Sequence, residues 1–328
     1  LPQDTAVFDA NSITIGSSTI TLNQACLPSV DFTNILNSPT INHTLTNGVI
    51  YIFGDITYKT GLTVSGTTQT QFCNHTGGTI TTAGLTTTYA TVLNTTGTYT
   101  MNGNLLLSGT PAITQIVGTF DANNYNITGG SFSSANTNTR VVNMGSGTWT
   151  MTGTGTVWTT ATSTNLTLTP GTSTIDITDT SATSKTFAGG SKTYYNLTAT
   201  GDNIIVSGSN TFNILRNQTA GLTNGLILTS STNQTFADFT TNGSAGSLAK
   251  LTATSAGTPA TLTKTSSIVS VDYMSIKDST ATGGAVFYAG ANSTNVSGNT
   301  GWFFIAAPSG GSTIGNNMAN SIINGILI

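Results

Sequence analysis

The stretch Thr98-Tyr-Thr-Met-Asn-Gly103 carries a large apolar side chain at every second position and then ends in Asn-Gly. A related stretch, Thr148-Trp-Thr-Met-Thr-Gly153, follows fifty residues later. Alternation with a period of two predicts a β-strand with one buried face, and the closing Asn and Gly predict a turn. Short strands separated by tight turns are therefore the elements from which we expect this fold to be built.

The same pattern continues along most of the chain. Further alternating runs include Ile50-Tyr-Ile-Phe53, Leu166-Thr-Leu168 and Ile268-Val-Ser-Val271, and pairs such as Asn47-Gly48 close them. Strand-rich segments recur about every 10 to 25 residues, a spacing that is compatible with both sandwiches and solenoids. The pattern therefore predicts an all-β chain but does not distinguish a β-sandwich from a β-solenoid.

The composition excludes helix as the main element. Only 6% of the 328 residues are charged, all eleven acidic residues are Asp, and none is Glu. The chain instead contains 71 Thr, 37 Gly and 32 Asn, which suit exposed strand faces and turns. Because 37% of the residues are hydrophobic and recur in alternation, the chain has enough apolar surface for a narrow core and is not expected to be disordered.

Three features favour a parallel β-helix (β-solenoid) of roughly a dozen rungs over β-sandwich domains, which remain the alternative. Segments resemble one another without a strict period, as stacked rungs with variable turns do. Thr, Asn and Ser can form ladders along such a stack, and few charges are present to protect the edges of an open sheet. The predicted division is an N-terminal cap (1–30), a β-solenoid (31–304), and a linker with an apolar C-terminal tail (305–328).

The end of the tail carries apolar residues at helix-like spacing. The tail is too short to span a bilayer and too apolar to extend freely into water. It is interpreted either as a docked cap or as a contact with a neighbouring subunit or larger particle. The candidate assembly residues are Met318, Ile322, Ile323, Ile326 and Leu327.

Several segments are similar to segments of a known group of proteins, above all Tyr273-Met-Ser-Ile-Lys-Asp278 and Gly298-Asn-Thr-Gly-Trp302 near the C-terminus. Val7-Phe-Asp-Ala-Asn-Ser12 and Thr183-Ser-Lys-Thr-Phe-Ala-Gly-Gly190 are similar in kind. The chain thereby resembles Thr/Gly-rich parallel β-helix proteins of tailed phages and bacterial surfaces. The resemblance implies an extracellular, tail- or fibre-associated protein at a virion or cell surface, and it brings no catalytic residues to carry over.

Carboxylates, which polysaccharide-cleaving enzymes use in pairs, are spread thinly along the chain. The closest pair, Asp176 and Asp179, is three residues apart in a strand-like segment, so the two side chains are expected on opposite faces. The acids are therefore interpreted as solvated turn residues. The sequence predicts no catalytic residue, no metal ligand set and no cofactor, and an enzyme acting on polysaccharide remains the less favoured alternative.

The chain contains two cysteines and two histidines, which are candidates for a zinc site or a disulfide. His43 and His75 sit in identical Asn-His-Thr triplets, and Cys73 lies two residues before His75. This spacing is not that of a usual zinc site. A disulfide between Cys26 and Cys73 is the candidate pairing in an oxidising compartment, and two buried free thiols are the alternative.

Asn-x-Ser/Thr sequons are frequent, but the abundance of Asn, Ser and Thr alone predicts about ten of them. They are candidate N-glycosylation sites if the source glycosylates surface Asn. The eleven residues are Asn42, Asn74, Asn94, Asn126, Asn165, Asn196, Asn217, Asn233, Asn242, Asn292 and Asn295.

The net charge of −3 gives no basic footprint for nucleic acid, and no apolar run is long enough to predict a membrane span. The favoured function is a non-enzymatic extracellular structural or adhesive protein, first of all a viral (phage) fibre, spike or decoration protein. The alternative is a self-assembling cell-surface filament or adhesin subunit of a bacterium or archaeon. Both imply a homo-oligomer or larger assembly. Surface glycans are candidate ligands, bound by exposed aromatic rings such as Tyr194, Tyr195, Trp149 and Trp158 and by ladders of Asn and Thr. The favoured interpretation of these four rings, however, is that they are core or stacking residues.

Overall fold

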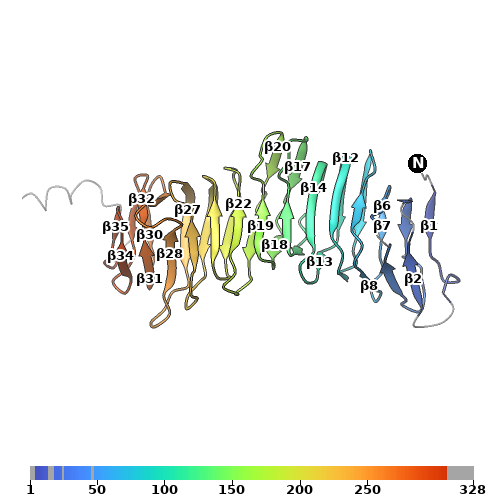
Figure 1. The fold of residues 1–328 in the computed structure, drawn as a ribbon, viewed down its shortest axis with the longest axis horizontal. Coiled ribbons are helices and arrows are strands. Elements are labelled where there is room, and N and C mark those ends of the chain that lie inside the picture. The colour runs from blue at the N-terminus through green and yellow to red at the C-terminus, as the bar shows by residue number, and fades with distance from the viewer. Residues whose placement is uncertain (1–3, 14–17, 24–25, 46–47, 309–328) are drawn as a thin grey trace, which may run out of the picture.

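The computed structural model describes residues 4–13, 18–23, 26–45 and 48–308, and every regular element in these ranges is a β-strand. Figure 1 shows the strands following one another along a single long axis, from β1 (Thr5–Val7) to β35 (Trp302–Phe303). Every ladder between named strands is parallel. The predicted β-solenoid is confirmed, and the antiparallel sheets of a β-sandwich are absent from the described ranges.

One face of the solenoid, which we call the long sheet, runs the full length of the described chain. Its thirteen strands pair one turn after another, so the solenoid has about thirteen turns against the dozen predicted. These strands are β3 (Cys26–Leu27), β6 (Ile50–Ile52), β9 (Thr70–Phe72), β12 (Thr91–Asn102), β14 (Ala112–Asp121), β16 (Ser131–Ser133), β19 (Gly155–Thr159), β22 (Lys185–Ala188), β24 (Ile204–Ser207), β26 (Leu226–Leu228), β28 (Ala249–Ala253), β31 (Met274–Lys277) and β34 (Thr294–Ser297).

A second face covers the N-terminal half. The long strands β12 and β14 turn the corner between the two faces, since their first residues pair within the long sheet and their last residues pair within the second face. The other strands of the second face are β1, β4 (Ser29–Asp31), β7 (Ile56–Thr57), β10 (Gly77–Thr81), β17 (Arg140–Asn143) and β20 (Leu166–Thr169).

A third face completes each turn. It begins with β2 (Thr19–Leu22), β5 (Thr40–His43) and β8 (Thr63–Gly66), and β11 lies beside β8. A small sheet of β30 (Ile268–Ser270), β33 (Val286–Tyr288) and β35 lies at the C-terminal end. The ten-stranded part of the third face contains β11 (Thr86–Thr87), β13 (Leu105–Leu107), β15 (Ile127–Gly129), β18 (Thr148–Met151), β21 (Thr174–Ile177), β23 (Asn196–Ala199), β25 (Thr211–Asn217), β27 (Asn233–Thr241), β29 (Ala260–Thr263) and β32 (Ser279–Thr282).

The turns differ in length while the strands stay in register. On the long sheet Thr114 lies opposite Ser133, 19 residues later, whereas Thr159 lies opposite Ala188, 29 residues later. The spacing of paired strands is fixed by their hydrogen bonds at about 4.8 Å, so the additional residues are accommodated in the loops. This explains why the sequence repeats are recognisable but not periodic.

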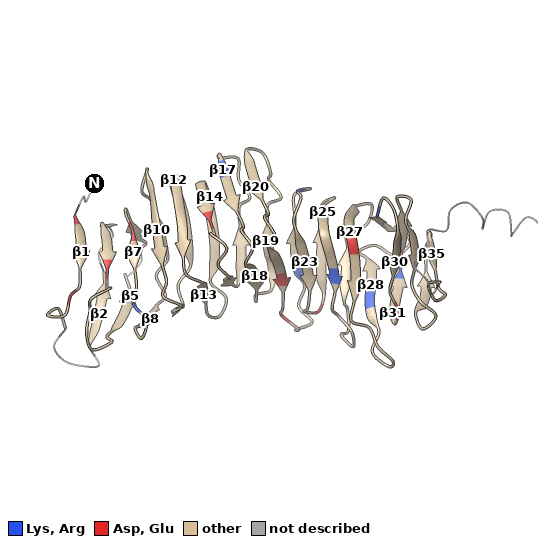
Figure 2. Ribbon diagram, turned by 180° about the vertical axis from the view of Figure 1, so that it is seen from behind, with Lys and Arg blue, Asp and Glu red and all other residues tan. Residues whose placement is uncertain are grey.

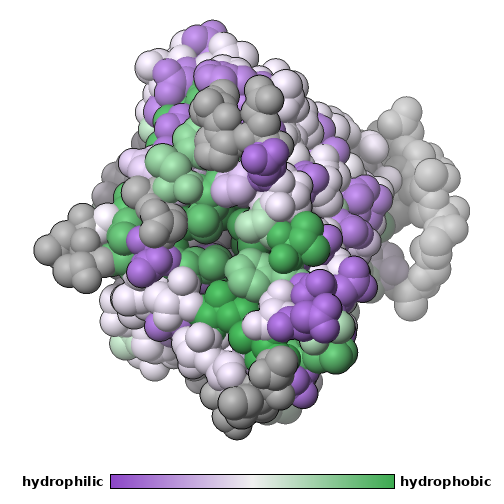
Figure 3. Space-filling model, turned by 90° about the vertical axis from the view of Figure 1, so that its right-hand side faces the viewer, coloured by the Kyte–Doolittle hydropathy of each residue, from purple (hydrophilic) through white to green (hydrophobic). Residues whose placement is uncertain are grey.

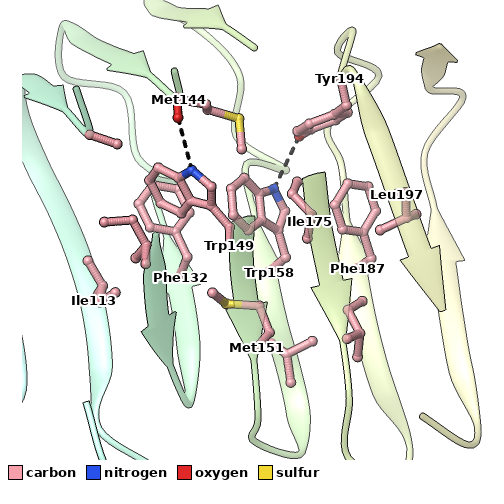
Figure 4. Close-up of a cluster of buried hydrophobic side chains, with 14 of the residues drawn as sticks. Ile113, Phe132, Met144, Trp149, Met151, Trp158, Ile175, Phe187, Tyr194 and Leu197 are labelled. Carbon is pink, nitrogen blue, oxygen red and sulfur yellow. Dashed lines mark hydrogen bonds between the residues drawn. The ribbon is translucent and has the colours of Figure 1, made fainter. Parts of the chain in front are cut away.

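Inward-facing side chains from the three faces form one continuous core. Its central part is aromatic (Figure 4): the ring centroids of Phe132 and Trp158 are 4.6 Å apart, and those of Trp158 and Phe187 are 6.0 Å apart. The indole nitrogen of Trp158 donates a hydrogen bond to the Tyr194 hydroxyl at 3.2 Å, and that of Trp149 donates to the Met144 carbonyl at 3.2 Å. Each large ring removed from water contributes about 1.5–3 kcal/mol, which compensates for a core only a few side chains wide.

Asn and Gly shape the corners between faces. Asn residues 37, 123, 124, 165 and 203 all have a positive φ, a conformation that Asn tolerates better than most residues. At Gly118, φ is +82° and an added Cβ would overlap the Thr95 carbonyl oxygen of the preceding turn. Close stacking of one turn on the next therefore requires glycine at this corner.

The two related stretches that indicated the fold do not occupy equivalent places. Tyr99 lies on the second face opposite Phe120, whereas Trp149 lies on the third face opposite Ile175. Their similarity therefore reflects a shared alternation of inward aromatic and outward Thr residues. It does not mark one turn following another.

Strands β1, β2 and β3 lie within the predicted N-terminal cap (1–30), and β1 pairs with β4, which crosses the predicted boundary at residue 30. At the other end β35 precedes the predicted linker and tail. Residues 309–328, which include all five candidate assembly residues, lie outside the described residues. The three-part division remains a prediction.

Candidate functional site

Rows of small polar side chains run along the outer faces. Because the ladders are parallel and in register, residues of the same outward position follow one another at about 4.8 Å. Neighbours in such rows also hydrogen-bond, as Asn102 Nδ2 does to Thr81 Oγ1 at 3.2 Å. One row on the third face consists of Thr128, Thr150, Asp176, Thr198, Arg216 and Thr240, and one on the second face consists of Thr79, Thr100, Asp121, Asn143 and Thr169. The flanks thus present regularly spaced hydroxyl and amide groups.

Charged residues are sparse on these faces (Figure 2), and several serve the fold. Asp179 accepts a hydrogen bond from the Ser181 amide at 3.0 Å and pairs with Lys185 Nζ at 3.1 Å. The Ser181 hydroxyl and the Lys185 ammonium together hold the pKa of Asp179 below its usual value. Asp202, itself buried, accepts the amides of Asn224 and Gly225 from the next turn at 2.8 and 2.7 Å. These carboxylates stabilise turns.

Asp176 and Asp179, the closest acid pair in the sequence, have separate surroundings. Asp176 lies in the outward row of β21, where burial raises its pKa and the Thr200 hydroxyl, 2.6 Å away, partly offsets the shift. Asp179 lies in the following corner with Lys185. The two carboxylates therefore have different partners rather than a common site.

Two buried cations were missed by reading the sequence. Lys185 is one of them, and Arg140 at the start of β17 is the other, with no exposed surface. The Arg140 guanidinium donates to the carbonyls of Asn138 at 2.9 Å, Thr162 at 3.2 Å and Thr164 at 2.6 Å, and also to the Ser134 carbonyl. The alternation in the sequence could have indicated the burial of Arg140, because Arg140 and Val142 are two residues apart in one strand and both face inward.

The twin histidines have opposite environments. His43 points into the core, with Nε2 2.7 Å from the Tyr58 hydroxyl and Nδ1 3.1 Å from the Thr70 hydroxyl, and its ring stacks on Tyr89 at 4.3 Å. Burial lowers the pKa of His43 to about 4. His75 is exposed and contacts the Thr96 hydroxyl at 3.2 Å. No three His, Cys, Asp or Glu side chains gather into a metal-binding group in the described ranges.

The candidate disulfide is not formed in this structure, and both thiols are free. The expected burial of free thiols is wrong for Cys26, which is exposed, and Cys73 is half-buried. Cys26 lies on β3 opposite Tyr51 of β6, and the Cys73 amide bonds to the Ile52 carbonyl of the same strand at 2.9 Å. Strand β6 thus separates the two cysteines by two strand spacings, about 10 Å, beyond the Cα separation of a disulfide. Burial raises the pKa of the Cys73 thiol.

The aromatic residues proposed as glycan contacts lie mainly in the core. Trp149, Trp158 and Tyr194 are fully buried, and Tyr195 is half-exposed. The interpretation of these rings as core residues is therefore confirmed for three of the four, and only Tyr195 offers exposed ring surface. The alternation in the sequence indicated that these aromatic side chains face inward from their strands. It did not indicate to which face of the solenoid each strand belongs.

The sequons divide into accessible and inaccessible sites. Asn196 and Asn217 are buried, and Asn217 Nδ2 donates to the Lys250 carbonyl at 2.9 Å, so a glycan at either side chain would require the corner to open. The remaining sites are half-buried or exposed. The exposed ones are Asn126, Asn165, Asn242, Asn292 and Asn295.

One surface depression of about 370 Å³ crosses three successive turns near the corner between the long sheet and the second face. It contains no charged side chain, and its polar groups are Thr hydroxyls and one Asn amide. The lining residues are Thr96, Val117, Gly118, Thr119, Asn138, Thr139 and Val141. Such a surface can hydrogen-bond a polar ligand but offers no general acid or base.

The two ends of the rod differ from its flanks. All seven large hydrophobic side chains that are exposed among the described residues lie in the first two or last three turns. Figure 3, which looks onto the N-terminal end, shows apolar residues gathered at its centre. The exposed residues are Val7 and Leu36 near the N-terminal end, and Ile268, Val286, Val296, Phe303 and Ile305 near the C-terminal end.

No protein-family model, curated protein or solved structure matches this chain. The described part of the chain contains no helix that is long and apolar enough to cross a membrane. The fold class is thus a parallel β-solenoid, and the relation to phage or bacterial-surface proteins remains a prediction from the sequence.

Proposed function

We propose that this chain is a non-enzymatic structural or adhesive rod that works outside the cytoplasm. The leading setting is a virion, in which it would serve as a fibre, spike or decoration protein of a phage. The observation that carries the proposal is the combination of a long, continuous solenoid with outer rows that consist mainly of hydroxyl and amide side chains and hold few charges. Such a surface tolerates water, salt and variable pH because few of its groups titrate.

The side-chain chemistry of the flanks supports an adhesive role through glycans. The Thr and Asn rows repeat at about 4.8 Å, and they present both donors and acceptors to a bound polymer. With three of the four proposed aromatic contacts buried, binding would depend on hydrogen bonds from these rows. Binding of this kind is weak for each sugar and gains strength from many copies in a virion or filament.

The second candidate is the subunit of a self-assembling surface filament or adhesin of a bacterium or archaeon. The apolar ends favour it, because exposed hydrophobic side chains cluster where consecutive rods would meet. A polysaccharide-degrading enzyme is less favoured, since the carboxylates nearest in sequence are bound in different surroundings.

The proposal is tested by incubating the full chain with a panel of bacterial surface polysaccharides and measuring retention and release of reducing ends separately. A structural or adhesive rod is expected to leave every polysaccharide intact, whether or not it is retained. Release of reducing ends at a rate that rises with protein concentration would contradict the proposal. Gold-labelled antibodies on intact virions and cells of the source then distinguish the two settings.

A further inference from the structure

We infer that the N-terminal end of one chain binds the C-terminal end of a second copy, so that rods join head to tail. This inference deepens the proposed structural role and rests on it. It names the partner, another copy of the chain, and the two surfaces that meet. The N-terminal junction surface is defined by β1, β3 and Val7, and the C-terminal junction surface by β34, β35, Phe303 and Ile305.

The distribution of apolar surface is the first observation. Val7 is 56% exposed at one end, and Phe303 and Ile305 are 52% and 57% exposed at the other. No large hydrophobic side chain is exposed on the flanks between the first two and last three turns of the described chain. Val7 lies opposite Asp31, and Phe303 follows the inward-facing Trp302, so both side chains project outward from the terminal turns. A contact that removes this apolar surface from water must therefore involve the terminal turns.

The open strand edges are the second observation. On the long sheet β3 pairs only with β6, and β34 pairs only with β31. Both terminal strands thus have one edge without a partner strand in the described chain, and all four residues of β34 are exposed. Since β3 and β34 belong to the same sheet and run parallel, a second copy placed end to end would continue the ladder across the junction.

The charge distribution is the third observation. Residues 1–130 contain five Asp and one Lys, which gives a net charge of −4, whereas residues 240–328 contain three Lys and two Asp, which gives +1. Head-to-tail contact brings the acidic end of one rod to the weakly basic end of the next. Contact between two N-terminal ends would instead place like charges together. The asymmetry thus favours one orientation and accelerates encounter.

The three observations select a heterologous contact, which joins two different surfaces. Such a contact does not close on itself when the subunits are stacked along one axis, so it produces open chains of subunits. Residues 309–328 lie outside the described residues, follow Ile305 in the sequence and contain Met318, Ile322 and Ile326. The competing occupant of the C-terminal junction surface is therefore the tail of the same chain.

The test uses the full chain and two charge-introducing variants, Val7→Asp and Phe303→Asp, with Thr167→Asp on the exposed flank of β20 as the matched control. Mass is followed by light scattering over a concentration series, and rod length by negative-stain microscopy. Val7→Asp and Phe303→Asp are each expected to weaken self-association by at least about tenfold. Thr167→Asp is expected to change it by less than about twofold.

Mixing the two end variants gives the most specific result. Val7→Asp keeps an intact C-terminal junction surface and Phe303→Asp keeps an intact N-terminal one, so an equimolar mixture should form dimers that grow no further. Circular dichroism of each variant establishes that the fold is kept. Association of either variant alone into dimers would indicate contact between two identical ends and would overturn the inference.

Crosslinking provides a second readout that does not depend on variants losing affinity. In a Cys73→Ser background, single cysteines at positions 294 to 297 of β34 are expected to form an intermolecular disulfide with the exposed Cys26 of β3. A full-length chain that stays monomeric at high concentration, or that associates only after residues 309–328 are removed, would overturn the inference. The polysaccharide assay addresses the structural role and this assay addresses the junction, so either can fail alone.

Discussion

Replacing His43 with glutamine is expected to remove a pH dependence of stability that the wild-type chain shows between pH 7 and pH 5. His43 is held neutral in the core by burial against Tyr89 and by the hydroxyls of Tyr58 and Thr70. Both tyrosines stay neutral throughout this range, because burial raises the pKa of Tyr58 and that of Tyr89. Protonation of His43 therefore places an uncompensated charge in the core.

The size of the effect follows from the pKa values. The pKa of His43 falls from 6.5 in the unfolded chain to about 4 in the fold, and this difference amounts to roughly 3 kcal/mol. Because the folded pKa is depressed, this stability is fully present above pH 6.5. It decreases as the pH falls and is lost by pH 4. Between pH 7 and pH 5 the loss is about 2 kcal/mol.

The assay is urea unfolding at pH 7, 6 and 5, followed by circular dichroism, together with hydrogen exchange of the β5 and β8 amides. His75→Gln is the matched control, because His75 occupies the same Asn-His-Thr context but is exposed. The wild type and His75→Gln should lose stability equally on acidification, and His43→Gln should lose far less. If His43→Gln kept the wild-type pH dependence, the assignment of the buried neutral histidine would be refuted.

Three further predictions concern the corners and the thiols. Arg140→Met should lower the free energy of unfolding by about 3–5 kcal/mol, because several buried carbonyls lose their hydrogen-bond donor. The control variant Arg216→Met, in an outward row, should change the free energy of unfolding by under about 0.5 kcal/mol. Equal urea midpoints for the two variants would contradict the structural role of Arg140. Gly118→Ala should lower the midpoint through overlap with the preceding turn, and an unchanged midpoint would count against the stacking described. Native protein should show two reactive thiols, and maleimide should label Cys26 faster than Cys73. Resistance of both cysteines to labelling before reduction would instead indicate that the Cys26–Cys73 disulfide forms.

Much of the fold was predictable because the alternation of side chains decides which residues face inward. The pattern Thr148-Trp-Thr-Met151 orients Trp149 and Met151 into the core, and the structure places both there. The corners followed from Asn and Gly, which adopt positive φ at low cost. These signals are local, so a single sequence reveals them.

The assignment of strands to faces was not predictable, because it depends on how long each loop is. The stretches around Tyr99 and Trp149 look alike but lie on different faces. The same limit applies to the histidines, since His43 lies on a strand and His75 in a turn although their triplets are identical. Separation across turns, which keeps Cys26 and Cys73 apart, likewise depends on the register of β6.

The variable turn length has a mechanical consequence. Residues paired on the long sheet are 19 to 30 positions apart in the sequence, yet each turn advances the rod by only about 4.8 Å. Tension applied at the two ends of the rod acts perpendicular to the strands. Because each turn contacts only the turns next to it, the outermost turn would detach first and the next turn would follow. One released turn supplies about 65 to 100 Å of extended chain. A rod of this kind would yield stepwise under load and dissipate a sudden pull before its attachment points fail.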